Sequence, residues 1–340
     1  MGSYVPEPEP RKLWIETPLI PSATMSRAAG CNIYLKLENL QPSGSFKSRG
    51  IGNMMLRAML SNPGGEAHFY CSSGGNAGLA CATAAITLAK PCTIVVPMST
   101  SEHMMAKLRL LGAEVKQVGA HWAEADAHLR QNLVAHDPAG VYVPPFDHPH
   151  VWEGASSIVT ELVPQMEVFG VEPDGIVCNV GGGGLLNGIM DGVDQAKAWK
   201  TKPQVLAVET VGADSLDASV KAGKLVTLPK ITSIATSLGA PTVSRRTFEW
   251  SKEKHLNNTV VTDAEAVMGC VRLVDDARIL VEVACGATIA PVYNGGLRKW
   301  LGEGLTDEEW SRKNVVLIVC GGSNISFEIL KSYQEKYNVS

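Results

Sequence analysis

A single lysine follows a loop rich in glycine and serine, and its position suits covalent chemistry. Residues 42–47 read PSGSFK, which places Lys47 at the first turn of a segment with helical apolar periodicity. The amine of a lysine condenses with a carbonyl compound when burial or nearby positive charge lowers its pKa. Most lysines are solvated surface residues, so Lys47 alone leaves both interpretations open.

A run of four glycines is the second chemical signal, and it consists of Gly181, Gly182, Gly183 and Gly184. The run follows an apolar segment and precedes a helical pattern that starts near Leu185. Successive N–H groups in such a turn, together with a helix N-terminus, suit a phosphate dianion. A dinucleotide fold is the alternative, because Glu209 ends the next apolar run. The spacing disfavours it, since the third glycine of G-x-G-x-x-G would fall on Leu186 or Asn187.

Two other loops at the ends of apolar runs carry polar groups. Residues 72–78, SSGGNAG, bring small residues that suit a carboxylate, and Asn76 can donate to a phenolic oxygen. Cys320 opens a second loop, CGGSN, at the kind of strand end where α/β proteins bind ligands. A condensing amine and a phosphate cradle are the two parts needed to hold an aldehyde-bearing, phosphorylated cofactor. The sequence therefore predicts pyridoxal phosphate.

Apolar runs alternate with longer helical patterns, which predicts parallel sheets with helices on both faces. The expected strands are 33–37, 68–72, 93–97, 114–118, 140–143, 175–180, 205–209 and 315–320. The expected helices are 45–60, 78–89, 102–111, 121–136, 152–166, 184–198 and 264–276. Proline-containing segments at 42–44 and 144–147 are the expected crossings between domains. They predict a large domain of residues 1–42 and 149–340 and a small inserted domain of residues 43–148.

Composition narrows the class of protein. A chain of 340 residues with 45% hydrophobic and 19% charged residues is typical of a globular enzyme of about two domains. A net charge of −4 offers no basic field for nucleic acid. No apolar run reaches the roughly 18 residues of a membrane span. Eight cysteines without a C-x-x-C pair, and a first segment (1–11) unlike a signal peptide, indicate a reducing compartment. We expect a cytoplasmic protein.

Together the motifs resemble the serine/threonine dehydratases, which are pyridoxal-phosphate enzymes of the tryptophan-synthase-β type, or fold type II. The resemblance covers residues 17–326 and rests on YLKLE (34–38), QPSGSFKSRGIG (41–52), WEG (152–154), KITS (230–233), ACGA (284–287) and CGGSNIS (320–326). It implies an α/β protein with two three-layer αβα domains and mostly parallel sheets. It also implies β-elimination of water from L-serine, with L-threonine as a further substrate. The products are pyruvate or 2-oxobutanoate, and ammonia.

The same resemblance implies roles for individual residues. Lys47 forms the Schiff base with the cofactor and acts as general base. The other cofactor contacts it implies are Phe46 on the ring, Asn76 at the 3′-oxygen, Cys320 at the pyridine nitrogen, and Gly181, Gly182, Gly183, Gly184 and Leu185 at the phosphate. The substrate carboxylate contacts are Ser72, Ser73, Gly75 and Asn76. A monovalent cation, K⁺ or Na⁺, is implied at Glu209, Ala213, Ser215 and Leu238. A homodimer and a small amino-acid substrate are the implied partners, without nucleic acid or membrane.

Departures from the family pattern keep other functions open. Val283 replaces an expected proline, and His148 and His150 differ from the usual stretch, so a dehydratase for a specialised β-hydroxy amino acid is one alternative. A β-replacement enzyme of the cysteine-synthase type is the second. A binding module without turnover is the third. Related racemases carry a hydroxyl at the position of Gly74, which predicts that this chain does not racemise its substrate.

Overall fold

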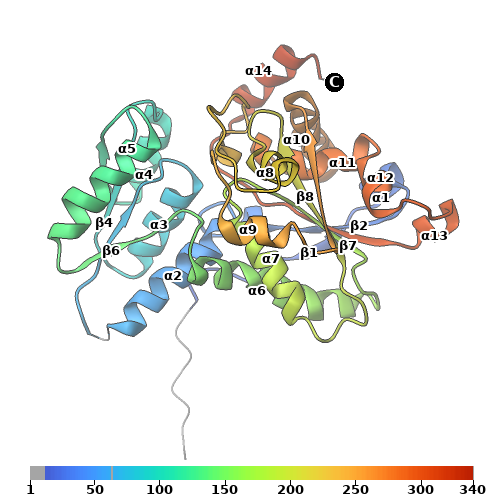
Figure 1. Cartoon of the computed structure of the whole chain (residues 1–340), viewed down its shortest axis with the longest axis horizontal. Coiled ribbons are helices and arrows are strands. Elements are labelled where there is room, and N and C mark those ends of the chain that lie inside the picture. The colour runs from blue at the N-terminus through green and yellow to red at the C-terminus, as the bar shows by residue number, and fades with distance from the viewer. Residues whose placement is uncertain (1–11, 63, 340) are drawn as a thin grey trace, which may run out of the picture.

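The computed structural model describes residues 12–62 and 64–339, and in that part the chain forms two β-sheets (Figure 1). The larger sheet has the strand order β1 (Leu19–Pro21), β2 (Asn32–Lys36), β10 (Asn314–Ile318), β7 (Gly175–Asn179), β8 (Gln204–Thr210) and β9 (Leu256–Val261). The smaller sheet has the order β5 (Glu114–Gln117), β4 (Cys92–Val96), β3 (His68–Cys71) and β6 (Gly140–Tyr142). Every pairing is parallel except that of β1 with β2. The predicted α/β class with mostly parallel sheets is confirmed.

Helices connect these strands. They are α1 (Ala23–Ala29), α2 (Lys47–Ser61), α3 (Asn76–Thr87), α4 (Glu102–Leu110), α5 (Trp122–His128), α6 (Pro149–Val168), α7 (Gly184–Gln195), α8 (Ser215–Ala222), α9 (Arg245–Trp250), α10 (Asp263–Ala277), α11 (Val283–Tyr293), α12 (Gly296–Leu301), α13 (Asp307–Ser311) and α14 (Phe327–Tyr337). In Figure 1, α3, α4 and α5 surround the smaller sheet on the left, and α2 joins that part to the rest. Helix α2 packs against both α3 and α6.

Three clusters of buried hydrophobic residues pack against the two sheets in the described part of the chain, and two of them are large. The larger core is built on buried strand residues such as Ile176 and Val316, and the smaller one on Phe69 and Ile94. Strand β4 is buried along its whole length, as expected for a continuous apolar run in a parallel sheet. The domain boundaries near residues 42 and 148 stay a prediction, and residues 1–11 of the first segment lie outside the described part. The expectation that residues 1–11 are not a signal peptide therefore also concerns residues outside the described part.

Most predicted elements are present, with strand ends shifted by one or two residues. Strands β1 and β9 were not predicted, because β1 buries only Leu19 and β9 is a half-buried edge strand with polar residues along it. The single helix expected over 121–136 is wrong. The α-helix ends at His128 and continues as a π-turn (Leu129–Leu133) and a 3₁₀ turn (Val134–His136). The π-turn is wider than an α-helix, and the 3₁₀ turn after it is tighter. Asp137 then accepts from the N–H groups of Ala139 and Gly140, which turns the chain into β6.

Candidate functional site

The loop before α2 and the loop after β10 are hydrogen-bonded to each other. The N–H of Phe46 donates to the carbonyl of Cys320 at 3.1 Å, and the N–H of Gly322 donates to the carbonyl of Gly44 at 2.9 Å. Gly44, Gly321 and Gly322 all have positive φ, a conformation that favours glycine. Two segments more than 270 residues apart in sequence thus meet at one point, which places Lys47 close to Cys320.

Lys47 begins α2, and its amine is withdrawn from solvent. Its Nζ donates to the carbonyl of Pro145 at 2.6 Å and lies 5.2 Å from the centroid of the Phe46 ring. Burial lowers the pKa of the Lys47 amine to about 8, although the thiols of Cys71 and Cys320 oppose the shift. A neutral amine is the form that attacks a carbonyl. The lowered pKa therefore raises the neutral, reactive fraction of the Lys47 amine near neutral pH.

The four glycines lie between β7 and α7, and two of them leave no room for a side chain. A Cβ at Gly182 would lie 2.3 Å from the ring of Phe146. Gly183 has φ of +98°, and a Cβ there would lie 1.7 Å from Oγ1 of Thr247. Only glycine fits this turn, because side chains from two other segments are packed against its backbone.

The N–H groups of this turn are free to bind an anion. Within residues 12–62 and 64–339, the N–H groups of Gly181, Gly182, Gly183, Gly184 and Leu185 meet no hydrogen-bond acceptor. The carbonyls of the turn, in contrast, are used: Gly182 accepts from Ser244 and Gly183 from Asn187. Orphan donors at the start of α7 suit a phosphate. With the amine of Lys47, they fit the cofactor that the sequence predicts.

Asn76 starts α3 and contacts residues of the larger-sheet part of the chain. Its Nδ2 donates to Glu282 at 2.9 Å, with a longer contact of 3.4 Å to the hydroxyl of Ser237. Its Oδ1 accepts from the N–H of Ser323 at 3.0 Å. Asn76 therefore joins the smaller-sheet side to the loop that carries Cys320.

The other residues predicted to bind a substrate carboxylate lie in the same strand–helix loop. Ser72 is fully buried, and its hydroxyl donates to Asp126 at 2.6 Å. That bond uses the hydroxyl hydrogen, so Ser72 would offer its N–H to a carboxylate. The hydroxyl of Ser73 accepts from the N–H of Gly75 at 3.3 Å. Their roles stay predictions.

The thiol of Cys320 is held in its protonated form. A hydrogen bond with Cys285 and burial raise the pKa of the Cys320 thiol well above its ordinary value. Nδ2 of Asn179 donates to the sulfur at 3.0 Å. A neutral thiol is a weak donor and carries no charge, unlike a carboxylate. At a pyridine nitrogen it would not hold a proton on the ring.

The residues proposed for a cation lie at the end of β8 and beyond it. Glu209 is fully buried and accepts from the N–H groups of Leu216 at 2.9 Å and Asp217 at 2.8 Å. Burial raises the pKa of Glu209 to about 8, against the effect of these two N–H groups. Ala213 and Ser215 lie in the turn into α8, whereas the backbone of Leu238 packs against Gly181. Among the described residues, no group of three or more His, Cys, Asp or Glu side chains could hold a metal ion.

A cavity of about 480 Å³ lies next to the segment that contacts Lys47 and the glycine turn. Pro145 and Phe146, which contact Lys47 and the glycine turn, form part of its lining. Asp126, Arg130 and His148 supply polar groups to it. The cavity meets the site through Pro145 and Phe146, and Lys47 is not among its lining residues.

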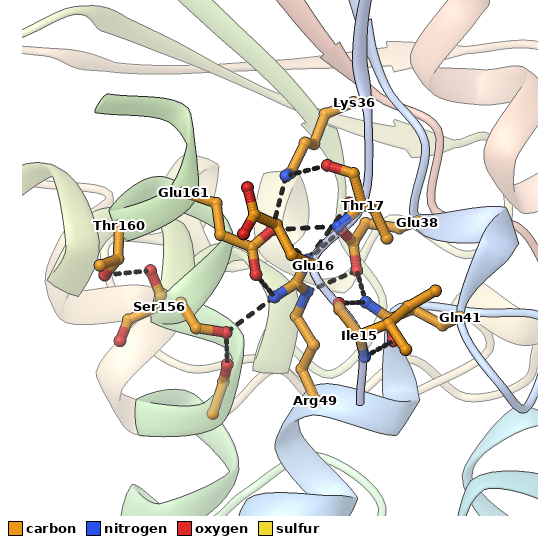
Figure 2. A network of polar contacts seen from close by, with 12 residues as sticks. Ile15, Glu16, Thr17, Lys36, Glu38, Gln41, Arg49, Ser156, Thr160 and Glu161 are labelled. Carbon is orange, nitrogen blue, oxygen red and sulfur yellow. Dashed lines mark hydrogen bonds and ion pairs between the residues drawn. The ribbon is translucent and has the colours of Figure 1, made fainter. Parts of the chain in front are cut away.

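Helix α2 is anchored by a buried ion network two residues after Lys47 (Figure 2). The guanidinium of Arg49 is fully buried and donates to both oxygens of Glu38, at 2.7 Å each. It also donates to both oxygens of Glu161, at 2.5 and 2.7 Å. Lys36 and Thr17 complete the network, since Nζ of Lys36 donates to Glu161 at 2.6 Å and the Thr17 hydroxyl donates to Glu38 at 2.6 Å. The network fixes the start of α2 against β2 and α6.

Several residues of this site carried no usable signal in the sequence. They are Glu282, Pro145, Phe146, Thr247 and the pair Arg49–Glu38. Apart from Arg49 and Glu38, which are 11 residues apart, each contacts a residue far away in the chain, so neither periodicity nor spacing relates it to its partner. Arg49 lies within the QPSGSFKSRGIG segment, and its proximity to Lys47 was the one available indication.

No helix among residues 12–62 and 64–339 is long and apolar enough to cross a membrane.

Comparison with known proteins agrees with this geometry. The sequence profile of the family described as pyridoxal-phosphate dependent enzyme matches residues 11–321. L-serine dehydratase/L-threonine deaminase of Bos taurus is 47% identical over 326 residues, which cover 96% of this chain and 96% of that protein. L-serine dehydratase of Saccharomyces cerevisiae is 39% identical, over 96% of this chain and 98% of that protein. The crystal structure of a fungal L-serine ammonia-lyase from Rhizomucor miehei has a TM-score of 0.86 and 38% identity, over 96% of this chain and 100% of that one. The chain therefore belongs to the pyridoxal-phosphate dependent enzymes, and within them to the serine/threonine dehydratase family.

Proposed function

We propose that this protein is a pyridoxal-phosphate-dependent ammonia-lyase that converts L-serine, and also L-threonine, into the 2-oxo acid and ammonia. The observation that carries the proposal is the buried amine of Lys47, whose pKa is lowered to about 8 beside Cys320. Bound cofactor would supply an aldehyde for covalent attachment and a ring that accepts electrons. The names of the similar proteins give the substrate class.

The chain's own residues then have distinct tasks. Lys47 would hold the aldehyde, and its Nζ, once free, would take the proton from the substrate Cα. The N–H groups of residues 181–185 would hold the phosphate. Asn76 would donate to the phenolic oxygen, and Phe46 would pack against the ring. The N–H groups of the loop 72–76 would orient the substrate carboxylate.

Cys320 would tune the reaction through its weak acidity. Because the thiol stays neutral and donates weakly, it would leave the pyridine nitrogen without a proton. A ring without that positive charge withdraws electrons less strongly, which favours prompt loss of the β-hydroxyl over transamination. Gly74, which has no hydroxyl, leaves no proton donor of its own at the face where a racemase needs one.

The test is a panel of β-hydroxy amino acids, scored for 2-oxo acid and ammonia. We expect L-serine and L-threonine to be consumed, and Lys47→Ala to abolish turnover. Lys224→Ala, a substitution of an exposed lysine, is the matched control and should keep full activity. Full activity of Lys47→Ala would refute the role of the amine. Cysteine formation from O-acetylserine and sulfide, without deamination of serine, would show a β-replacement enzyme instead.

We also propose a monovalent cation, K⁺ or Na⁺, at Glu209, Ala213, Ser215 and Leu238. Glu209 would supply a carboxylate, and the other three residues mostly backbone oxygens. A homodimer and a cytoplasmic location are further proposals. Size-exclusion chromatography with light scattering would test the dimer, and fractionation of cells that express the tagged protein would test the location.

A further inference from the structure

Glu282 is a buried carboxylate to which the proposed function gives no role. It precedes α11, and only 4% of its surface is exposed. Its backbone is fixed, because its carbonyl accepts from the N–H groups of Cys285 at 2.8 Å and Gly286 at 3.0 Å. Its side chain packs against Gly322: a Cβ at Gly322 would lie 2.4 Å from Cδ of Glu282.

Three donors from three segments converge on this carboxylate. Oε1 accepts from Nδ2 of Asn76 at 2.9 Å and from the N–H of Asn324 at 2.6 Å, and Oε2 accepts from the hydroxyl of Ser237. Asn76 belongs to the smaller-sheet side, whereas Ser237 and Asn324 belong to the larger-sheet side. A carboxylate is an acceptor only, which suits two partners that can only donate.

This arrangement allows one orientation of the Asn76 amide. Oδ1 must face the N–H of Ser323, and Nδ2 must face Glu282. A flipped amide would place its oxygen against the carboxylate and its NH₂ against an N–H group, which leaves every contact unmatched. The second hydrogen of Nδ2 meets only the Ser237 hydroxyl at 3.4 Å, so it remains available for a better acceptor.

We propose that Glu282 is a positioning residue that holds Asn76 with a donor, rather than an acceptor, directed at the phenolic oxygen of the cofactor. This inference rests on the proposed function, because it assumes that the cofactor oxygen lies at Asn76. A phenolic oxygen that receives an N–H bond is stabilised in its ionised form, which gives the long-wavelength, yellow band of the bound cofactor. Glu282 thereby sets both the affinity for the cofactor and its absorbance.

The test uses the Glu282→Met variant, with Glu303→Met at an exposed position as the matched control. A methionine has a similar length but offers no strong acceptor to the amide of Asn76. We expect the dissociation constant of pyridoxal phosphate, measured by titration of the apoprotein, to rise about tenfold. The yellow band should fall relative to the short-wavelength band in Glu282→Met, and neither quantity should change in the control.

A second variant separates the acceptor from the charge. In Glu282→Gln the amide oxygen can accept from Asn76 and from the N–H of Asn324 while the NH₂ donates to the hydroxyl of Ser237, so every contact keeps a partner. We expect Glu282→Gln to keep the band ratio and the cofactor affinity of the native protein. A native band ratio in Glu282→Met, or an equal loss in Glu282→Gln and Glu282→Met, would overturn the inference. Failure of the unmodified protein to bind pyridoxal phosphate would instead refute the proposed function.

Discussion

Replacement of Arg49 by methionine should destabilise the protein by about 3–5 kcal/mol, the usual cost of breaking a buried ion pair. Methionine fills similar space but leaves Glu38, which is fully buried, without its main partner. Glu161 keeps only Lys36 as a charged partner. Two carboxylates would then lie close together in the interior with one cation between them. The start of α2, and with it Lys47, would lose its attachment.

The deficit should depend on pH with a definite sign. In the native protein burial opposes ionisation of Glu161, yet hydrogen bonds from Arg49 hold its pKa below the ordinary value. The ionised form therefore contributes stability above the ordinary glutamate pKa, and this contribution is lost as the pH falls through the lowered value. Without Arg49, burial dominates and raises the pKa of Glu161. Protonation at lower pH then removes the buried negative charge, so the variant is less destabilised in acid. The stability difference should shrink between about pH 7 and about pH 5.

Urea unfolding of both proteins at each pH would measure this difference. Arg57→Met is the matched control, because Arg57 lies on the same helix and pairs with Glu153 at an exposed position. An exposed pair contributes about 0–1 kcal/mol. We expect the affinity for pyridoxal phosphate to fall in Arg49→Met and to stay constant in the control. Equal stability of the two variants, or a deficit that grows in acid, would refute this account of the network.

Other substitutions test the site itself. Gly183→Ala should lower the affinity for pyridoxal phosphate at least tenfold in a titration, since its Cβ would meet Thr247. Gly170→Ala, which is also at positive φ but in open space, should leave the affinity unchanged. Equal effects of the two substitutions would contradict the steric argument. Cys320→Asp should protonate the pyridine nitrogen and raise the ratio of transamination to elimination, measured by product analysis; unchanged partitioning would count against the role of the thiol. Burial raises the pKa of Glu209 to about 8, with Asp214 and Asp217 adding to the effect, so protons should compete with the cation. Half-saturation of activity by K⁺ should therefore need less salt at pH values above about 8 than below, and a pH-independent requirement would argue against this site.

The elements that the sequence predicted correctly are those with a local signature. Strand β4 is a continuous apolar run, and the glycine turn at 181–184 is four identical residues between two apolar segments. Strand β9 was not predicted because it has no apolar alternation: its central residues include Asn257, Asn258 and Thr259. An edge strand does not need that alternation. The helix expected over 121–136 changes its winding after His128, although its helical apolar pattern continues.

The amino-acid sequence by itself determined which groups were available: an amine after a Gly/Ser loop, a run of four glycines between two apolar segments, and a thiol at a strand end. Tertiary structure alone decided their partners. The carbonyl of Pro145 for Lys47, Glu282 for Asn76 and Glu161 for Arg49 all lie about 100 or more residues away. The physical reason is that backbone conformation depends on near neighbours, whereas burial, hydrogen bonding and the resulting pKa shifts depend on segments that meet only after folding.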